Sequence, residues 1–388
     1  MLKVKLMVLS VLTLVYILNN EGFAAIADGW VLRQISNSGY INEYTTLDIS
    51  GNNCVWQENN NKIMLYDGNS TRQISSGTYL GDVPQISGTN VVWSEYIGGH
   101  YQIMFWNGST ATQISSGTNE CYYPQISGTY VVWHEYIGGT RQIMFYNGST
   151  ATQISSGTNE WDGPQISGTY VVWAEKYQIM FWNGSSVTQI SSGTNSCYEP
   201  QISGTNVVWR EDKYFGGGGQ IMFWNGSTAT QISSGTNPRY GPQISGTNVV
   251  WFENIIGLTP QIMFWNGSTV RQITANVKRK ENLSISETNV VWHERPYGYN
   301  DITIISFYDG NTVIKMAELV GENHDTSLSE SNIFWTAYDE NYDCQVFLCR
   351  PGDTPPPTQP LKGDINKDNI VDFKDLAILA SDWLKSGQ

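Results

Sequence analysis

A motif of about forty residues occurs eight times along this chain of 388 residues. The clearest copy reads Pro84-Gln-Ile-Ser-Gly-Thr-Asn-Val-Val-Trp93, followed by Gln102-Ile-Met-Phe-Trp-Asn-Gly-Ser-Thr-Ala-Thr-Gln-Ile-Ser115. The tryptophan of the motif recurs at Trp56, Trp93, Trp133, Trp173, Trp209, Trp251, Trp292 and Trp335. A fixed period of this length is typical of stacked or radial repeats, because each unit buries its apolar face only against a neighbouring unit.

Each unit divides into four short runs of β-forming residues, separated by turn residues. In the second unit the runs are 84–87, 90–96, 102–106 and 111–115. Asn107-Gly108 stands between two runs and predicts a two-residue hairpin, because both residues tolerate a positive φ. Four antiparallel strands in each of eight units predict an all-β, eight-bladed β-propeller, with an open β-solenoid as the main alternative.

The two ends of the repeat favour the closed ring. A fragment of the unit, Leu32-Arg-Gln-Ile-Ser36, precedes the first full copy, and the last copy lacks this fragment. We therefore expect 30–36 to form the outer strand of the eighth blade, whose other three strands come from 325–349. Such pairing covers two strand edges at once, and a solenoid would gain nothing from it.

The strand-turn pattern and the Val-Val-Trp and Gln-Ile-Ser signatures resemble those of TolB-like propeller repeats over residues 30 to about 350. This resemblance implies a propeller fold of the kind found in periplasmic and cell-surface proteins. A propeller fold hosts unrelated functions, so the resemblance concerns architecture rather than activity. We place the propeller domain at 28–350.

The charge and the N-terminal segment indicate the compartment and exclude some partners. The formal net charge of −14 argues against nucleic acid and against anionic membrane surfaces, which both require a basic face. Residues 1–27 resemble a secretory signal, with Lys3 and Lys5 before an apolar run and Ala25-Ile-Ala27 as the cleavage site. We expect a secreted protein, extracellular or periplasmic, that starts at Asp28 and has no membrane span.

The five cysteines are predicted to be mostly unpaired. An odd number cannot pair completely within one chain. Cys121 and Cys197 occupy the same loop position two blades apart, which is too far for a disulfide. Cys344 and Cys349 share one predicted strand, where their spacing places the side chains on opposite faces.

The C-terminal segment carries a calcium-loop pattern. A proline-rich linker at 351–362 separates the propeller from a module at 363–388. Oxygen ligands for a twelve-residue EF-hand-type loop, which would bind Ca²⁺, are Asp364, Asn366, Asp368, Ile370 through its carbonyl, Asp372 and Asp375. Apolar residues at helical spacing follow the loop, so we predict a small loop-helix unit. An acidic solvated tail is the alternative.

This loop-helix unit resembles one calcium-binding repeat of a type I dockerin, including Asp375 at position 12. The resemblance implies docking onto a cohesin-like or surface partner in a polysaccharide-degrading assembly. Dockerins normally carry two such repeats, whereas this chain has one. Pairing with a second chain, a surface-attachment role and a remnant therefore remain alternatives for 363–388.

Variation among the eight units predicts where a ligand binds. The Ser-Gly-Thr and Asn-Gly-Ser turns lie on one face and barely change, whereas the blade-to-blade connections and the second-to-third strand loops lie on the other face and diverge. Function tends to sit on variable loops of a rigid scaffold. Candidate residues for a carbohydrate or protein ligand are Tyr122, Tyr123, Glu160, Trp161, Asp162, Tyr198, Glu199, Arg239 and Tyr240. Plugging of the channel by these aromatic residues is the alternative.

A glutamate recurs two residues after the tryptophan in seven units, and its constancy predicts a structural role rather than a cation site. The near identity of the central units favours a scaffold over a catalyst, and no nucleophile motif or histidine cluster is present. We therefore predict a secreted, non-catalytic binding protein. A polysaccharide-degrading enzyme, a glycoside hydrolase or lyase with its site on the variable face, is the alternative.

Overall fold

The structure is a computed structural model that describes residues 27, 29–36, 41, 46–58, 62–76, 81–156, 163–212, 218–296, 302–320, 325–338 and 344–352. The predicted signal (1–27, of which only Ala27 is described), the calcium module at 363–388 and Glu160, Trp161 and Asp162 lie outside these residues. The described residues form strands and turns only. The strands are β1 (Trp30–Gln34), β2 (Leu47–Ser50), β3 (Asn53–Glu58), β4 (Lys62–Tyr66), β5 (Thr71–Gln73), β6 (Gly81–Ser87), β7 (Asn90–Ile97), β8 (His100–Trp106), β9 (Ala111–Gln113), β10 (Cys121–Ser127), β11 (Tyr130–Ile137), β12 (Thr140–Tyr146), β13 (Ala151–Gln153), β14 (Gln165–Ser167), β15 (Tyr170–Glu175), β16 (Gln178–Trp182), β17 (Val187–Gln189), β18 (Ser196–Ser203), β19 (Asn206–Asp212), β20 (Gln220–Trp224), β21 (Ala229–Gln231), β22 (Arg239–Ser245), β23 (Asn248–Glu253), β24 (Gln261–Trp265), β25 (Val270–Gln272), β26 (Arg279–Ser286), β27 (Asn289–Arg295), β28 (Ile302–Tyr308), β29 (Val313–Val320), β30 (Thr326–Ser329), β31 (Asn332–Tyr338) and β32 (Cys344–Pro351).

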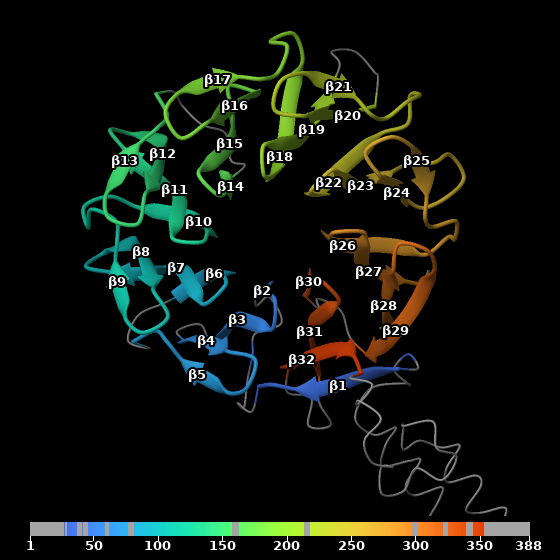
Figure 1. The fold of residues 1–388 in the computed structure, drawn as a ribbon, viewed down its shortest axis with the longest axis horizontal. Helices are drawn as coiled ribbons and strands as arrows, with labels where there is room; N and C mark the ends of the chain where they lie inside the picture. The colour runs from blue at the N-terminus through green and yellow to red at the C-terminus, as the bar shows by residue number, and fades with distance from the viewer. Residues whose placement is uncertain are drawn as a thin grey trace, which may run out of the picture.

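The strands form eight four-stranded antiparallel sheets, which are arranged as the blades of a propeller (Figure 1). Blade 1 has the order β2-β3-β4-β5, and blades 2 to 7 follow the same pattern with four consecutive strands each, from β6 to β29. The first strand of each blade lies toward the centre of the ring. The predicted eight-bladed propeller is therefore confirmed.

The eighth blade joins the two ends of the propeller. Its order is β1-β32-β31-β30, and β1 pairs antiparallel with β32 from Trp30 opposite Pro351 to Gln34 opposite Phe347. This is the closure predicted from the fragment that precedes the first full repeat. Because β1 covers the outer edge of β32, the last blade has the same four strands as the others.

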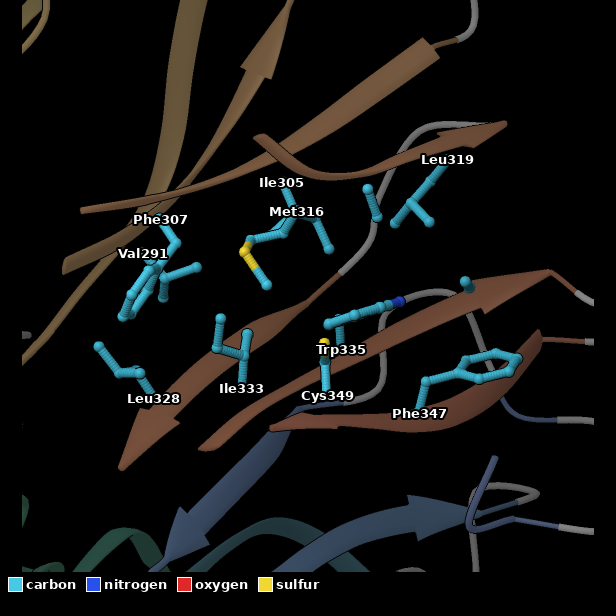
Figure 2. Packing of buried hydrophobic residues seen from close by; sticks show 12 residues of the cluster. Val291, Ile305, Phe307, Met316, Leu319, Leu328, Ile333, Trp335, Phe347 and Cys349 are labelled. Atoms are coloured by element: carbon cyan, nitrogen blue, oxygen red, sulfur yellow. The ribbon is translucent and has the colours of Figure 1, made fainter. Parts of the chain in front are cut away.

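The core is divided among the interfaces between neighbouring blades. Each of eight apolar clusters joins two adjacent blades, including the pair formed by blade 8 and blade 1. Figure 2 shows the cluster between blades 7 and 8, where Met316 and Phe307 face Ile333 and Trp335. All eight repeat tryptophans are completely buried in such clusters. The motif repeats because every blade packs the same set of apolar side chains, including its tryptophan, against the neighbouring blade.

All five cysteines are buried and unpaired, as the sequence predicted for most of them. Cys349 packs in the cluster between blades 7 and 8, whereas Cys344 packs in the cluster between blades 8 and 1. The two thiols therefore lie on opposite faces of the same blade. Burial raises the pKa of Cys349 to about 12, which keeps this thiol protonated and unreactive.

The inner strands begin earlier than the sequence predicted. In blade 2 the strand starts at Gly81 instead of Pro84, and blades 3, 5, 6 and 7 show the same extension. Each of these strands has a register shift, which falls between Tyr122 and Gln125 in blade 3. A β-bulge leaves one residue outside the ladder, so a proline without an N–H group fits within the strand.

The Asn-Gly turn differs from the predicted two-residue hairpin. The loop in blade 2 has four residues, Asn107 to Thr110, and only Gly108 has a positive φ, of 92°. The Asn107 Oδ1 atom accepts hydrogen bonds from the backbone N–H groups of Ser109 (3.0 Å) and Thr110 (2.9 Å). Asparagine is therefore used for its side-chain acceptor, which closes an Asx turn, and not for a left-handed backbone.

Candidate functional site

The antiparallel blades give the ring two different faces. The turns from first to second strand and from third to fourth strand lie on one face, which we call the constant face. The second-to-third strand loops and the starts of the inner strands lie on the other, which we call the variable face. This division follows from the strand order of each blade and agrees with the division predicted from the sequence.

The constant face is held by a closed ring of hydrogen bonds. In every blade the serine that ends the inner strand accepts a bond from a backbone N–H of the next blade, at 2.7 to 2.9 Å. The series includes Ser329, which accepts from Gly51 and so joins blade 8 to blade 1. The Ser-Gly-Thr turn is constant because each copy completes one link of this ring.

A second set of bonds on the constant face involves the residue that begins the second strand. In six blades it is an asparagine, whose Nδ2 donates to a backbone carbonyl of the next blade at 2.8 to 3.1 Å. In blades 3 and 4 the residue is Tyr130 or Tyr170, whose ring stacks on Phe145 or Phe181. The side chains at this position of the constant face are therefore engaged in contacts within the propeller itself.

The recurring glutamates also have structural contacts. Glu95 accepts from the indole Nε1 of Trp93 at 2.7 Å and from the Ser76 hydroxyl at 3.0 Å. The same indole bond recurs in blades 3 to 7 at 3.1 to 3.4 Å. Six of the seven glutamates are buried. In blades 2, 3, 5, 6 and 7 the carboxylate also accepts from a side chain of the blade-to-blade connection, which supports the predicted structural role.

One position at the start of the inner strand anchors the connection before it. Cys121, Cys197, Arg239 and Lys280 occupy this position, and each donates to the carbonyl two residues earlier. Burial raises the pKa of the Cys121 and Cys197 thiols to about 12 and lowers the pKa of Lys280 to about 8. Hydrogen bonds from these side chains therefore hold the blade-to-blade connections of the variable face at the point where each inner strand begins.

Arg239 does not lie on the surface where we expected it. Its side chain is fully buried, and its Nε atom lies 2.9 Å from Glu253 Oε2. It also donates to Asn237 O at 2.8 Å. The sequence prediction took Arg239 for a loop residue because the bulge that extends the inner strand was not foreseen. In the structure Arg239 supports the variable face from below.

The predicted tyrosines of blade 3 belong to a row of aromatic rings. Ring centroids are 5.6 Å apart between Tyr101 and Tyr122 and 6.3 Å apart between Tyr122 and Tyr123. The row continues to Tyr96 at one end and to His134 at the other. Tyr96 and Tyr101 come from the hairpin of blade 2, so the row crosses the interface between two blades.

The carboxylate of Glu120 lies beside this row. It accepts from the Tyr101 backbone N–H at 2.8 Å and from the Tyr122 hydroxyl at 3.1 Å, and it lies 3.2 Å from His100 Nδ1. Burial opposes the charge, but these hydrogen bonds outweigh it and lower the pKa of Glu120. Burial and the bond to Glu120 raise the pKa of Tyr122 to about 12. The site presents an anionic carboxylate next to the neutral phenol of Tyr122.

The other predicted residues that the structure describes on this face lie in blades 5 and 6. Tyr198 contacts Tyr177 of blade 4 and carries the Arg210 guanidinium over its ring at 4.8 Å. Glu199 pairs with Arg210 at 3.1 Å and accepts from the Gly241 N–H at 2.7 Å. Tyr240 packs on Phe252, with ring centroids 5.3 Å apart. Among the predicted residues that the structure describes, Tyr122 and Tyr123 thus lie in the aromatic row of blades 2 and 3, Tyr198 contacts blade 4, and Glu199 joins blade 5 to blade 6 beside Tyr240.

Sequence reasoning missed the residue between the tryptophan and the glutamate. This position holds a different side chain in nearly every blade, namely Gln57, Ser94, His134, Ala174, Arg210, Phe252, His293 and Thr336. It stands opposite the variable inner strand, as His134 stands opposite Tyr122. Its variation within a constant motif is the signal that could have identified it.

His134 is the most unusual member of this set. Its ring is buried, and in the part of the chain that the structure describes neither ring nitrogen has a hydrogen-bond partner. Burial, with a smaller effect of Arg141, lowers the pKa of His134 to about 4. The imidazole is therefore neutral at physiological pH.

Exposed apolar side chains mark the variable face. Among the described residues, those on this face are Tyr96, Tyr123, Tyr136, Tyr177, Ile256, Leu258 and Val277. The remaining ones, Val31, Val187, Val270 and Val313, lie on the outermost strands of their blades. No exposed large apolar side chain among the described residues lies in a constant-face turn. The exposed apolar side chains are therefore divided unequally between the two faces.

No cluster of three or more histidine, cysteine, aspartate or glutamate residues suited to a metal ion occurs among the described residues. The predicted calcium ligands from Asp364 to Asp375 lie outside them. Within the same described part of the chain, no helix has the length and apolar character needed to cross a membrane.

The sequence matches no known family and no curated protein, whereas several solved structures share its fold. An acylaminoacyl peptidase from Pyrococcus horikoshii is 12% identical, with a TM-score of 0.50 over 76% of this chain and 57% of that chain. The β-propeller domain of the Trilobed protease from Pyrococcus furiosus, described as having an open velcro topology, is 11% identical, with a TM-score of 0.50 over 70% and 97%.

A TolB structure from Agrobacterium tumefaciens also matches, at 14% identity and a TM-score of 0.37 over 72% of this chain and 93% of that chain. At such identities the likeness concerns the fold alone. The chain spans little more than half the length of the acylaminoacyl peptidase. The two Pyrococcus structures agree with the propeller architecture derived above.

Proposed function

We propose that this protein is an exported, non-catalytic binding protein that recognises a carbohydrate or protein ligand through the variable face of its propeller. The observation that supports this proposal is the difference between the two faces of the propeller. The constant face is occupied by a ring of interblade hydrogen bonds, whereas the exposed tyrosines gather on the variable face. Aromatic side chains with a few fixed polar groups are the usual lining of ligand sites.

The test compares binding with turnover for the full chain in calcium-containing buffer. A glycan array and a peptide array detect the ligand class, and reducing-sugar release detects hydrolysis or lysis of plant and algal polysaccharides. Binding without turnover is the expected result. Turnover that disappears in Glu160→Gln or Asp162→Asn would instead establish a polysaccharide-degrading enzyme and overturn the proposal.

A matched pair of variants locates the binding face. Tyr123→Ala and Tyr177→Ala remove rings that are 44% and 48% exposed on the variable face. Val270→Ala removes an apolar side chain that is 41% exposed on an outermost strand. We expect weaker binding for the two tyrosine variants and unchanged binding for the valine variant. The reverse pattern would place the ligand on the outer rim.

We propose further that 363–388 bind one Ca²⁺ and tether the propeller to a cohesin-like or surface partner. The support is the ligand spacing of Asp364, Asn366, Asp368, Asp372 and Asp375 with the carbonyl of Ile370. Calorimetric titration of the full chain should give one calcium site, which Asp364→Ala combined with Asp368→Ala removes. An unchanged titration in this double variant would exclude the loop as the site.

A further inference from the structure

Two pairs of tyrosines occupy equivalent places in the propeller. Tyr101 and Tyr177 each directly precede the Gln-Ile-Met segment of their blades. Tyr122 and Tyr198 each stand two residues before the proline of the following inner strand. The ring centroids are 5.6 Å apart in both pairs. The pairs therefore repeat the same aromatic contact at the interface of blades 2 and 3 and at that of blades 4 and 5.

This contact is not a general feature of the fold. The residues before the third-strand segment of blades 3, 5 and 6 are Arg141, Gly219 and Pro260. None of the four paired tyrosines belongs to the interblade clusters that the described residues form. Burial of the core thus does not explain why tyrosine recurs at both places.

The surroundings of the pairs indicate the chemistry of a ligand. Tyr177 is 48% exposed, and Tyr123, beside the first pair, is 44% exposed. Next to the first pair lies the Glu120 carboxylate, whose pKa is lowered, after the opposing effect of burial, by hydrogen bonds that include the Tyr101 N–H. The whole chain carries a net charge of −14. A polyanion is repelled by this surface, whereas hydroxyl groups donate to carboxylates and apolar C–H faces pack on aromatic rings.

Because the two tyrosine pairs occupy equivalent places, they indicate what kind of ligand would fit both. Two similar contacts, separated by one intervening interface of an eight-bladed ring, suit a ligand that presents the same unit more than once. A chain of identical sugar residues has this property. Joining two weak sites through one ligand raises the overall affinity well above that of either site, because the second contact becomes intramolecular.

We infer that Tyr101 with Tyr122 and Tyr177 with Tyr198 form two equivalent subsites that bind one uncharged polysaccharide chain bivalently. The inference rests on the proposed binding function and specifies its ligand. Each subsite packs tyrosine rings against a sugar residue. The first subsite adds Glu120, and the second adds Arg210, which lies over Tyr198 and pairs with Glu199.

The test uses the full chain with Tyr122→Ala, Tyr198→Ala and the double variant. Probes are soluble β-glucan, xylan and galactomannan, with polygalacturonate as an anionic polymer and trisaccharides of the same neutral sugars. We expect at least one neutral polymer to bind, about a 10-fold or greater loss in each single variant and abolition in the double variant. Trisaccharides should occupy two sites in the wild-type chain and one in each single variant.

Control variants separate folding from recognition. Val270→Ala removes a 41% exposed apolar side chain on an outermost strand, away from the variable face, and it should bind as the wild type does. Tyr122→Phe and Tyr198→Phe keep the ring and should retain most of the affinity. Thermal unfolding of every variant shows whether a loss of binding follows from a loss of fold.

Different outcomes overturn different statements. If the wild-type chain binds a neutral polymer but the double variant binds it equally well, the subsites are wrong and the binding function stands. If one single variant equals the double variant while the other equals the wild type, one subsite acts alone and bivalency is wrong. Preferred binding of polygalacturonate contradicts the uncharged ligand. If the wild-type chain binds no polysaccharide but binds a peptide, carbohydrate recognition itself is wrong.

Discussion

The two faces of the propeller have different roles, although the same repeat forms both. On the constant face all eight blades use a serine acceptor for the same interblade bond, and six use the same asparagine donor. On the variable face different blades carry unrelated side chains, such as Tyr123, Glu199 and Asn282 at the bulges of blades 3, 5 and 7. The apolar core and the constant face therefore hold the ring together. The side chains of the variable face can differ from blade to blade without opening it.

The largest expected effect tests whether the variable face is supported from inside. Arg239→Met removes the fully buried cationic partner of Glu253 and leaves this carboxylate without its counter-charge. We expect a loss of about 3–5 kcal/mol in the free energy of unfolding, measured by urea denaturation. Arg279→Met, which removes a 69% exposed side chain that pairs with Glu281, should cost less than about 1 kcal/mol. Unchanged stability for Arg239→Met would mean that this guanidinium is not structural.

The next effect is a pH dependence that originates behind the variable face. Burial, then Arg141, lowers the pKa of His134 from 6.5 to about 4, so the unfolded chain binds one more proton than the folded chain between these values. Stability should fall as the pH decreases from about 6.5 to about 4, by an amount on the order of 2–3 kcal/mol from this residue. His134→Ala, the residue of blade 4 at this position, should remove that part of the acid sensitivity.

Urea denaturation of both proteins at pH 7.5 and pH 4.5 measures this prediction. His134→Ala should lose stability relative to the wild type at pH 7.5, because it leaves a cavity. Its disadvantage should shrink at pH 4.5. An equal difference at the two pH values would show that His134 gains a proton as readily in the folded chain as in the unfolded one.

A smaller effect tests the ring of the constant face. Ser127→Ala removes the acceptor of the Gly168 N–H bond, which is 2.8 Å long. We expect a loss of about 0.5–1.5 kcal/mol by thermal or urea unfolding, with ligand affinity unchanged. Ser109→Ala, in an exposed turn outside the ring, serves as the control. A loss of ligand affinity in Ser127→Ala would show that the two faces are not independent.

The smallest effect tests whether a residue of the variable face lowers the stability of the fold while it contributes to ligand binding. Tyr123 has a φ of 54°, and the equivalent residues of blades 4 and 6 are Gly163 and Gly241. Tyr123→Gly relieves the left-handed backbone, so it should raise the free energy of unfolding by up to about 1 kcal/mol and weaken ligand binding.

Two controls accompany this variant. Tyr123→Phe keeps both the backbone strain and the ring, so its stability and its affinity should stay close to the wild type. Gly241→Ala should lose stability, because its φ is +61° and an added Cβ would lie 3.3 Å from the Phe252 ring. A destabilised Tyr123→Gly would indicate that the tyrosine ring stabilises the fold.

The predictions from sequence succeeded where structure repeats locally. The positions of Trp93 and its seven counterparts, the turn residues between runs and the extra N-terminal fragment specified the blades and their closure. The strand and turn patterns depend on residues near one another in the chain, and repetition strengthened each signal, whereas the closure of Trp30 onto Pro351 was inferred from the strand missing in the last copy. Starts of the inner strands were missed, because a bulge at Tyr123 that accommodates Pro124 depends on pairing with the next strand.

The sequence by itself determined eight four-stranded units, the closure of the ring and the division into a constant and a variable face. Only the tertiary structure decided that Arg239 lies inside the blade, that His134 is buried beside Tyr123, and that Tyr101 meets Tyr122 while Tyr177 meets Tyr198. Strand patterns are set by nearest neighbours, so they can be read along the chain. The environment of a side chain depends on contacts across strands and between blades, and these exist only once the ring has formed.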